Sequence, residues 1–174
     1  MKRRLMQCLA LAMFIGFSAV RAPGGEPKDA DARKEAIKKE LAKLEGRWKV
    51  VSREVKRTNT PAEDVKDLQL TIRGDRWTMT HSSGVDKAII KIDPAHEPKT
   101  IDWTFTSLGA MGKTLKPPAG RKIVSRGIYK LVYTEGDGET LTVCRVDQPR
   151  LARPKEFKTT ENAGLLFVFK RESK

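Results

Sequence analysis

Apolar and polar positions follow two different periods along the chain. From Asp29 to Leu44 the apolar residues are spaced three, four and seven apart among Lys and Glu, and this spacing predicts an amphipathic helix with one narrow apolar stripe. Asp29 or Asp31 can cap its N-terminus, and Gly46 follows its end. Because a narrow stripe is a docking surface, we expect this helix to pack on an end or a wall of the remaining structure.

After Gly46 the period becomes two, which predicts half-buried strands. A first strand is predicted over residues 47–56, with Trp48, Val50 and Ser52 on one face and Val51 and Val55 on the other. Seven further alternating runs lie at residues 68–73, 77–80, 88–92, 101–106, 123–134, 141–144 and 165–169.

The segments between the strands are mostly short. Thr60-Pro61-Ala62-Glu63 predicts a capping box that starts a short helix ending at Asp67. Residues 107–122 contain three glycines and Pro117-Pro118, which predict a long loop, and residues 147–164 predict a second polar loop. Since no long helix separates the strands, a parallel α/β sheet is disfavoured.

Eight strands joined mainly by hairpins indicate an all-β domain. An up-and-down antiparallel barrel preceded by a helix is the simplest arrangement, because closure removes the edges of the sheet. An open sandwich is the alternative. A barrel of eight strands has an interior wide enough for its own side chains or for one small ligand.

The first 22 residues have the order of a secretory signal peptide. Residues 2–4 are basic, residues 5–20 form an apolar run, and small residues follow. A retained anchor is disfavoured, because a membrane-spanning helix needs about 20 apolar residues. Cleavage after Ala22 and cleavage after Gly24 both remain open. We therefore expect export to the periplasm or the exterior, with no stable membrane span after cleavage.

The expected domains are the signal peptide at 1–22, a flexible segment and helix at 23–45, and the barrel at 46–172. Removal of residues 1–22 leaves 31 basic and 22 acidic residues, so the formal net charge falls from +13 to +9. It also leaves Cys144 as the only cysteine, which excludes a disulfide framework. A lone cysteine in an apolar strand is usually a buried hydrophobic residue.

A series of spaced motifs resembles a lipocalin-like domain family that is abundant in planctomycete bacteria. The motifs are Leu44-x-Gly46-x-Trp48, Leu70-Thr71-Ile72-x-Gly74-Asp75, Ile92-Asp93-Pro94, Pro98-Lys99-Thr100-Ile101-Asp102, Gly112-Lys113-Thr114, Gly127-Ile128-Tyr129-Lys130-Leu131, Leu141-x-x-Cys144 and Arg153-Pro154-x-x-Phe157. The resemblance covers roughly residues 40–172 and implies an exported lipocalin-like barrel, but it implies no reaction. The stretch that holds Pro117-Pro118 is longer than in chains that resemble this pattern.

The chain offers little that suggests catalysis or a cofactor. Its two histidines, His81 and His96, have no ligand at metal spacing, and no Gly-x-Ser-x-Gly elbow or phosphate-binding loop is present. Asp93 and Asp102 could form a pair of catalytic carboxylates, but Asp93-Pro94 is typical of a turn. Asp102 is expected on the polar face or beside a base. We therefore expect no catalytic residue, metal or cofactor.

The candidate ligand-binding residues are Trp48, Trp103, Tyr129 and Arg145. The tryptophans, Trp77 included, could line a cavity, although core packing is the favoured interpretation. Asp102, Arg126 and Arg145 fall within strand patterns, and any that points inward needs a partner. An internal Asp–Arg pair is favoured over a ligand carboxylate as that partner.

Three functional hypotheses follow. The first is a non-catalytic binding module for a small apolar or amphipathic ligand. The second is a filled barrel that binds a protein or an anionic envelope polymer, since the chain is basic. An enzyme comes third. Nucleic-acid binding is not expected, because an exported protein rarely meets nucleic acid and the basic residues are spread along the chain.

Overall fold

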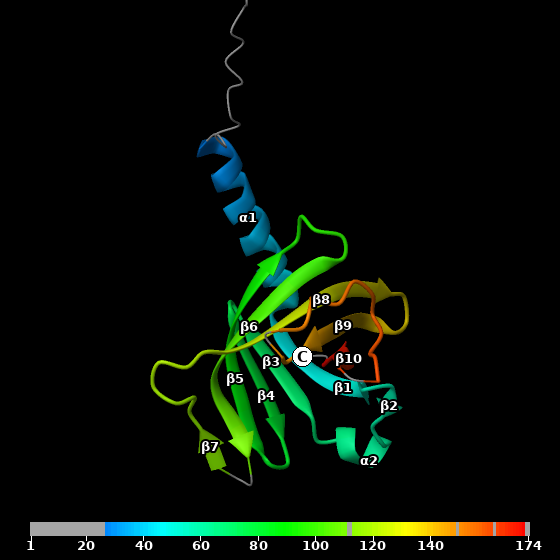
Figure 1. Cartoon of the computed structure of the whole chain (residues 1–174). Coiled ribbons are helices and arrows are strands. Elements are labelled where there is room, and N and C mark those ends of the chain that lie inside the picture. Colours follow the sequence, from blue (N-terminus) through cyan, green and yellow to red (C-terminus); the bar gives the residue numbers. More distant parts are fainter. Residues whose placement is uncertain (1–26, 111–112, 149, 162, 173–174) are drawn as a thin grey trace, which may run out of the picture.

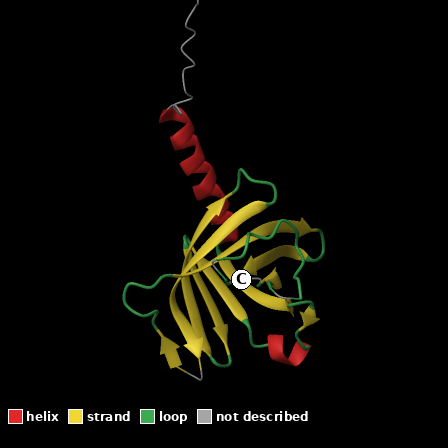
Figure 2. Ribbon diagram, viewed as in Figure 1, coloured by secondary structure: helices red, strands yellow, loops and turns green. Residues whose placement is uncertain are grey.

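Eight antiparallel strands close into a barrel in the computed structural model, which describes residues 27–110, 113–148, 150–161 and 163–172. Each strand pairs with the next along the chain, and β10 returns to pair with β1. The predicted helix and up-and-down barrel are therefore confirmed (Figures 1 and 2). The barrel strands are β1 (Gly46–Val55), β3 (Gln69–Arg73), β4 (Arg76–His81), β5 (Gly84–Asp93), β6 (Lys99–Ala110), β8 (Ile123–Thr134), β9 (Gly138–Val146) and β10 (Leu165–Arg171).

Two helices and two short strands complete the described structure. They are α1 (Pro27–Leu44), α2 (Ala62–Val65), β2 (Thr58–Asn59) and β7 (Lys113–Leu115). The predicted signal peptide, residues 1–22, lies outside the described ranges. Within those ranges no helix has the length and apolar content that crossing a membrane requires.

Helix α1 closes one end of the barrel. Leu44, Leu41 and Ile37 of its apolar stripe pack on the core, while its N-terminal part extends away from the barrel (Figure 1). The helix ends at Leu44, as predicted, but it begins at Pro27, so that Asp29 lies in its first turn and is not its cap. Gly46 follows with φ of +136°, a conformation that side chains disfavour.

Trp48 joins the end of α1 to the sheet. Its side chain is fully buried, and its Nε1 donates a hydrogen bond to the Leu44 carbonyl oxygen at 3.0 Å. The guanidinium of Arg171 lies 4.0 Å from the centre of the indole ring. Arg171 also donates to the carbonyl oxygens of Lys43 and Glu45, so it binds groups that the end of the helix leaves without partners.

Glu40 is the one acidic residue of α1 that is buried against the barrel. Lys99 Nζ lies 2.5 Å from its Oε1, and Lys43 Nζ lies 3.2 Å from its Oε2. Burial alone would raise the pKa of Glu40, but hydrogen bonds and charge from the two lysines lower it. The carboxylate therefore stays ionised where α1 meets the barrel.

A β-bulge in β1 changes which residues face the barrel interior. Val50 pairs with Phe169, but Ser52 pairs with Val168, so Val51 is an extra residue. The predicted inward face holds for Trp48 and Val50 but is wrong for Ser52, which is exposed. Beyond the bulge, Arg53 takes the inward position opposite Phe167.

The predicted loop at 107–122 is wrong in its first part. Strand β6 continues to Ala110, and β7 pairs with it. The glycine that suggested a loop serves a close approach instead, since a Cβ on Gly109 would lie 2.3 Å from the Val85 nitrogen. Residues 116–122 form the loop that remains.

The predicted capping box at Thr60 does not form. Helix α2 begins at Ala62 after Pro61, without a side-chain cap, and ends at Val65 rather than Asp67. The Thr60 N–H donates to the Arg53 carbonyl oxygen at 2.8 Å. In a capping box the Glu63 side chain would accept this N–H, so the bond to Arg53 takes the place of that interaction.

Candidate functional site

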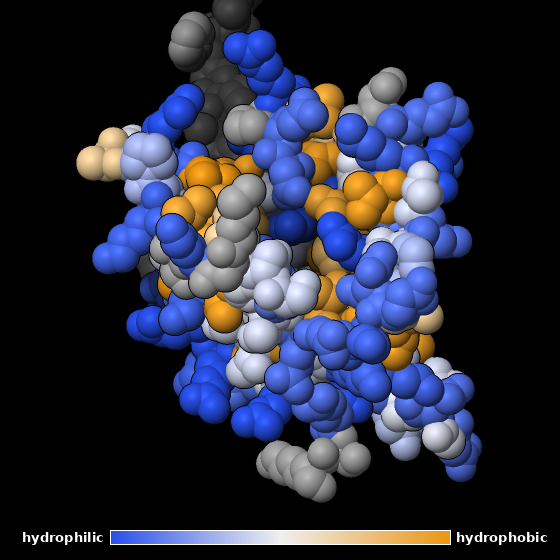
Figure 3. Space-filling view, turned by 90° about the horizontal axis from the view of Figure 1, so that it is seen from below, coloured by the Kyte–Doolittle hydropathy of each residue, from blue (hydrophilic) through white to orange (hydrophobic). Residues whose placement is uncertain are grey.

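The barrel is packed near α1 and hollow near α2. An aromatic layer crosses it, in which the Trp77 ring meets Trp103 edge-on at 5.6 Å and Phe169 edge-on at 6.0 Å between ring centres. On the α2 side of this layer a cavity of about 610 Å³ opens, a volume in the range of 300–1,000 Å³ usual for small-molecule sites. Figure 3 looks at this end of the barrel, where apolar side chains surround a hollow between polar ones.

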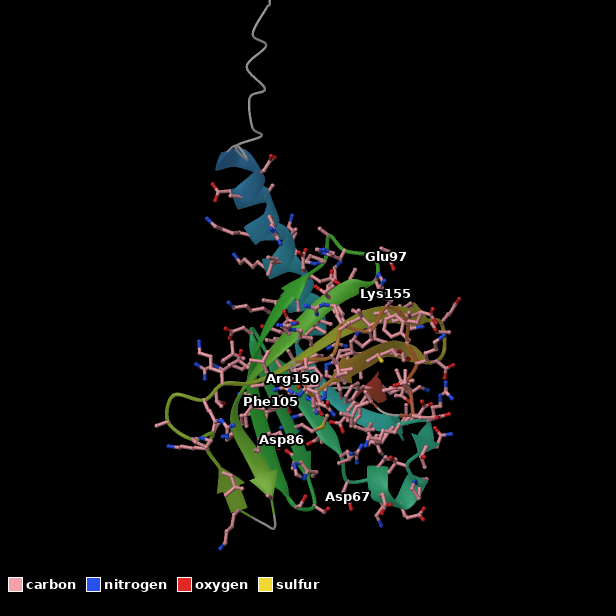
Figure 4. The ribbon with its side chains drawn as sticks, in the orientation of Figure 1. Asp67, Asp86, Glu97, Phe105, Arg150 and Lys155 are labelled. Carbon is pink, nitrogen blue, oxygen red and sulfur yellow. The ribbon has the colours of Figure 1, made fainter. Side chains whose placement is uncertain are left out.

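The apolar wall of the cavity comes from strands on several sides of the barrel. Its strand members are Trp77 and Met79 of β4, Phe105 of β6, Val143 of β9, and Leu165 and Phe167 of β10, and Leu68 adds to it from the residue before β3. Alternation places the strand members there, because each is in phase with the buried residues deeper in its own strand. In Figure 4, Phe105 lies on its strand in the same half of the barrel as Asp86 and Asp67.

Four ionisable side chains also face this cavity from the strands: Arg53 of β1, His81 of β4, Asp86 of β5 and Arg145 of β9. Asp86 pairs with Met79 across the ladder, and Arg145 pairs with Leu165. Each pair shares one face of the sheet, so the two charged residues lie inward with apolar partners.

Residues at the strand ends surround the mouth of the cavity. Ser82 and Ser83 come from the β4–β5 turn, and Thr60, Glu63, Asp64 and Asp67 come from the segment around α2. The α2 side of the mouth is therefore acidic.

Both arginines lie against aromatic rings. The Arg145 guanidinium is 5.7 Å from the centre of the Trp103 ring and 5.2 Å from that of Phe105. That of Arg53 is 5.7 Å from the centre of the Phe167 ring. Such cation–π contacts favour a positive charge in an apolar site.

The Arg145 guanidinium does not form all of the hydrogen bonds that its donors allow. Its Nε lies 3.4 Å from Asp147 Oδ1 but forms no hydrogen bond within the described chain, and the same holds for Nε of Arg53. Burial lowers the pKa of Arg145, the charges of Asp147 and Asp86 oppose that shift, and the charge of Arg53 adds to it. The two guanidiniums are therefore close enough to repel each other.

Ser83, His81 and Asp86 stand in a row at the mouth. Ser83 Oγ lies 2.8 Å from His81 Nδ1, and His81 Nε2 lies 3.4 Å from Asp86 Oδ1. This order has the appearance of a nucleophile, base and carboxylate, but the second link is not a hydrogen bond, because His81 Nε2 has no partner among the described residues. Asp86 Oδ1 instead accepts the Gly109 N–H at 2.8 Å.

Of the four candidate ligand-binding residues, only Arg145 lines the cavity. Trp48 lies at the α1 end. Trp103 lies in the aromatic layer, where its ring contacts the Arg145 guanidinium. Tyr129 is buried beside Glu40, with its hydroxyl 3.5 Å from Oε1, and burial followed by the Glu40 charge raises its pKa. Trp48 and Trp103 therefore belong to the packed core, whereas Trp77 lines the cavity.

The charged residues of the strands divide between the two faces of the barrel. Asp102 faces outward, as predicted, and its Oδ1 lies 2.7 Å from Arg153 Nη2. Arg126 is exposed. Arg145 is the one that points inward, and its nearest carboxylate is Asp147 rather than Asp102.

Asp93 and Asp102 have separate cationic partners and do not form a catalytic pair. Asp93 lies at the α1 end, where its Oδ2 is 2.6 Å from Arg33 Nη2 and 3.1 Å from His96 Nδ1. Its Oδ1 accepts the Ala95 N–H at 3.1 Å, the turn contact that Asp93-Pro94 predicts. Within the described residues, no group of three or more His, Cys, Asp or Glu side chains is placed to hold a metal ion.

Cys144 lies on the outer face of β9 beneath the loop at 147–164. Its thiol is fully buried and donates to the Lys158 carbonyl oxygen at 3.4 Å. Burial raises its pKa to about 11, so the thiol stays protonated at neutral pH. A smaller hollow of about 290 Å³ adjoins it under the same loop.

Of the four ionisable strand residues in the cavity, three were missed from the sequence as site residues: Arg53, His81 and Asp86. The phase of the strand could have placed two of them, since His81 follows Trp77 and Met79 at period two, and Asp86 precedes Ala88 and Ile90. Arg53 offered no such signal, because the bulge shifts its phase by one residue.

Comparison of the chain with protein-family models, curated proteins and solved structures found no match.

Proposed function

We propose that this protein is an exported binding module that holds a small apolar or amphipathic ligand in the cavity between α2 and the aromatic layer, without changing it chemically. The observation that carries the proposal is the half-filled barrel. A packed layer of Trp77, Trp103 and Phe169 supports an open space of about 610 Å³. A barrel whose only role is structural would gain stability by filling that space, because cavities cost packing energy.

The surface of the cavity fits such a ligand. Seven apolar side chains offer a hydrophobic contact area, and a few polar groups among them could fix the orientation of a ligand, as in most small-molecule sites. Export rests on the order of charge and apolar residues in residues 1–22, and the lipocalin-like family on the motifs from Leu44 to Phe157. Both accord with a carrier or receptor of small molecules outside the cytoplasm.

A neutral fluorescent probe tests the cavity directly. We expect N-phenyl-1-naphthylamine to bind the purified protein with increased fluorescence at a one-to-one ratio. Val143→Phe, which adds a ring to the cavity wall, should weaken that binding, because it occupies the volume that the probe needs. The matched control is Val132→Phe on the outside of β8, where Val132 is 44% exposed, and it should bind as the wild type does.

The binding proposal fails if the wild-type protein leaves the probe dark, or if Val143→Phe binds it as tightly as the control does. Native mass spectrometry of protein purified from its host offers a second measurement. A mass increment that organic extraction removes would identify the ligand itself.

The non-catalytic part of the proposal has its own test at Ser83. Because the imidazole of His81 lacks the hydrogen bond to Asp86 that would orient it as a base, we expect p-nitrophenyl butyrate to be hydrolysed at the rate of buffer alone. Ser83→Ala should give the same rate. Turnover by the wild type that disappears in Ser83→Ala would instead identify an esterase.

A further inference from the structure

Two arginines and an apolar wall line the same cavity. Arg53 lies on β1 and Arg145 on β9, on either side of β10. Strands two positions apart in a sheet are about 10 Å apart, which two long side chains can bridge from both sides. Trp77 and Met79 line the cavity from β4, and Phe105 lines it from β6 with its ring centre 5.2 Å from the Arg145 guanidinium.

The guanidiniums are held in place but are not fully bonded. Phe167 supports Arg53, and Trp103 and Phe105 support Arg145. The Nε atoms of both are buried without an acceptor among the described residues. A buried donor that lacks an acceptor is costly, and an oxyanion is the acceptor that suits a guanidinium best, because it can take two parallel hydrogen bonds.

The charges around the cavity also define where an anion can bind. Asp147 lies 3.4 Å from Arg145 Nε, and Asp86 lies close enough to raise the pKa of that guanidinium. Glu63, Asp64 and Asp67 line the mouth on the α2 side. An anionic group is repelled by this acidic mouth and attracted by the two arginines inside it.

We propose that the ligand carries an oxyanion at one end, bound inside the barrel by Arg53 and Arg145, while its apolar body packs against Trp77, Met79 and Phe105. This inference rests on the proposed binding function and defines its ligand class. A carboxylate and a phosphate share the chemistry that the two guanidiniums recognise, and both enter the test below.

Two fluorescent probes with the same carbon skeleton distinguish the contribution of the anionic group to binding from that of the apolar body. 1-Anilinonaphthalene-8-sulfonate is N-phenyl-1-naphthylamine with one added sulfonate. We expect the wild-type protein to bind the sulfonate at least about tenfold more tightly than the neutral probe, the ratio that one charge-assisted hydrogen bond supplies. Both affinities are measured by fluorescence titration of the full-length protein.

Substitution of each arginine should act on one probe only. Arg53→Met and Arg145→Met keep an unbranched side chain in the wall, so each should weaken the sulfonate about tenfold and change the neutral probe less than about twofold. Arg126→Met is the matched control, since Arg126 is exposed on β8, and it should alter neither affinity. Thermal unfolding followed by circular dichroism shows whether each variant is folded.

Substitution of Asp147 should have the opposite effect on the affinity for the sulfonate probe. Asp147→Asn removes the carboxylate next to Arg145 but keeps an oxygen that can accept from Ser125 Oγ, now 2.5 Å from Asp147 Oδ1. It should strengthen binding of the sulfonate and leave the neutral probe unchanged. A merely structural role for this residue would weaken both probes together.

Competition identifies the natural headgroup. Decanoate and decyl phosphate are compared with decanol for displacement of the sulfonate probe, and displacement by either anion at lower concentration than decanol supports the proposal. Equal displacement by decanol, equal affinity for both probes, or parallel loss of both in the arginine variants would overturn it while the binding function stands. If neither probe binds, the binding function and this inference both fail.

Discussion

Trp48→Ala is expected to lower the free energy of unfolding by about 3–5 kcal/mol, the range for removal of a large buried aromatic side chain. Trp48 is fully buried at the point where α1 joins β1, and its side chain contacts both α1 and β10. Its Nε1 donates a hydrogen bond to the Leu44 carbonyl oxygen, and the Arg171 guanidinium lies over its ring. Because a domain is usually stable by about 5–15 kcal/mol, this loss removes a large part of the total.

Urea unfolding followed by circular dichroism measures the loss. Trp48→Phe should lose less than Trp48→Ala, because it keeps a ring beneath Arg171 but lacks the Nε1 donor. Val132→Ala on the outer face of β8 is the control and should change stability by less than about 0.5 kcal/mol. A Trp48→Ala variant as stable as this control would mean that the α1 end does not depend on the indole ring.

The predictions from the sequence are correct at the α1 end for a physical reason. There most of the inward strand residues are apolar, so alternation and burial give the same answer, as at Ile101 and Trp103 of β6. The helix stripe, the end of α1 at Leu44 and the number of barrel strands could be predicted for the same reason. These features depend on hydrophobic burial, which a pattern of apolar residues records directly.

At the α2 end the same logic fails, because polar residues at inward positions break the pattern. His81 and Asp86 face inward although they are polar, so the alternation of apolar residues stops before the strand does. Arg53 faces inward only because Val51 is an extra residue in β1. A bulge depends on pairing between β1 and β10, which are more than 100 residues apart in sequence, and no local pattern contains that information.

Substitution of Gly127, which packs closely against β9 and the Trp103 ring, has the second large expected effect. A Cβ at this position would lie 2.4 Å from the Cys144 carbonyl oxygen, 2.9 Å from Trp103 Cζ3 and 3.0 Å from Arg145 Cβ. The first of these is a backbone atom of β9, which cannot move without shifting its strand. Gly127→Ala is therefore expected to destabilise the fold by about 1–3 kcal/mol through overpacking.

The same substitution should also affect binding, because it pushes on the atoms that place Arg145 over Trp103. We expect Gly127→Ala to reduce the preference for the sulfonate probe over the neutral one, in addition to lowering stability. Gly136→Ala is the matched control: its φ of +83° brings a backbone cost, but nothing lies within 4 Å of the added methyl group, so only stability should change. Urea unfolding and the two fluorescence titrations measure both effects. If Gly127→Ala kept full stability and the full preference, β8 and β9 would have to be further apart than the structure shows. The close packing that glycine allows at position 127 would then not be what positions Arg145.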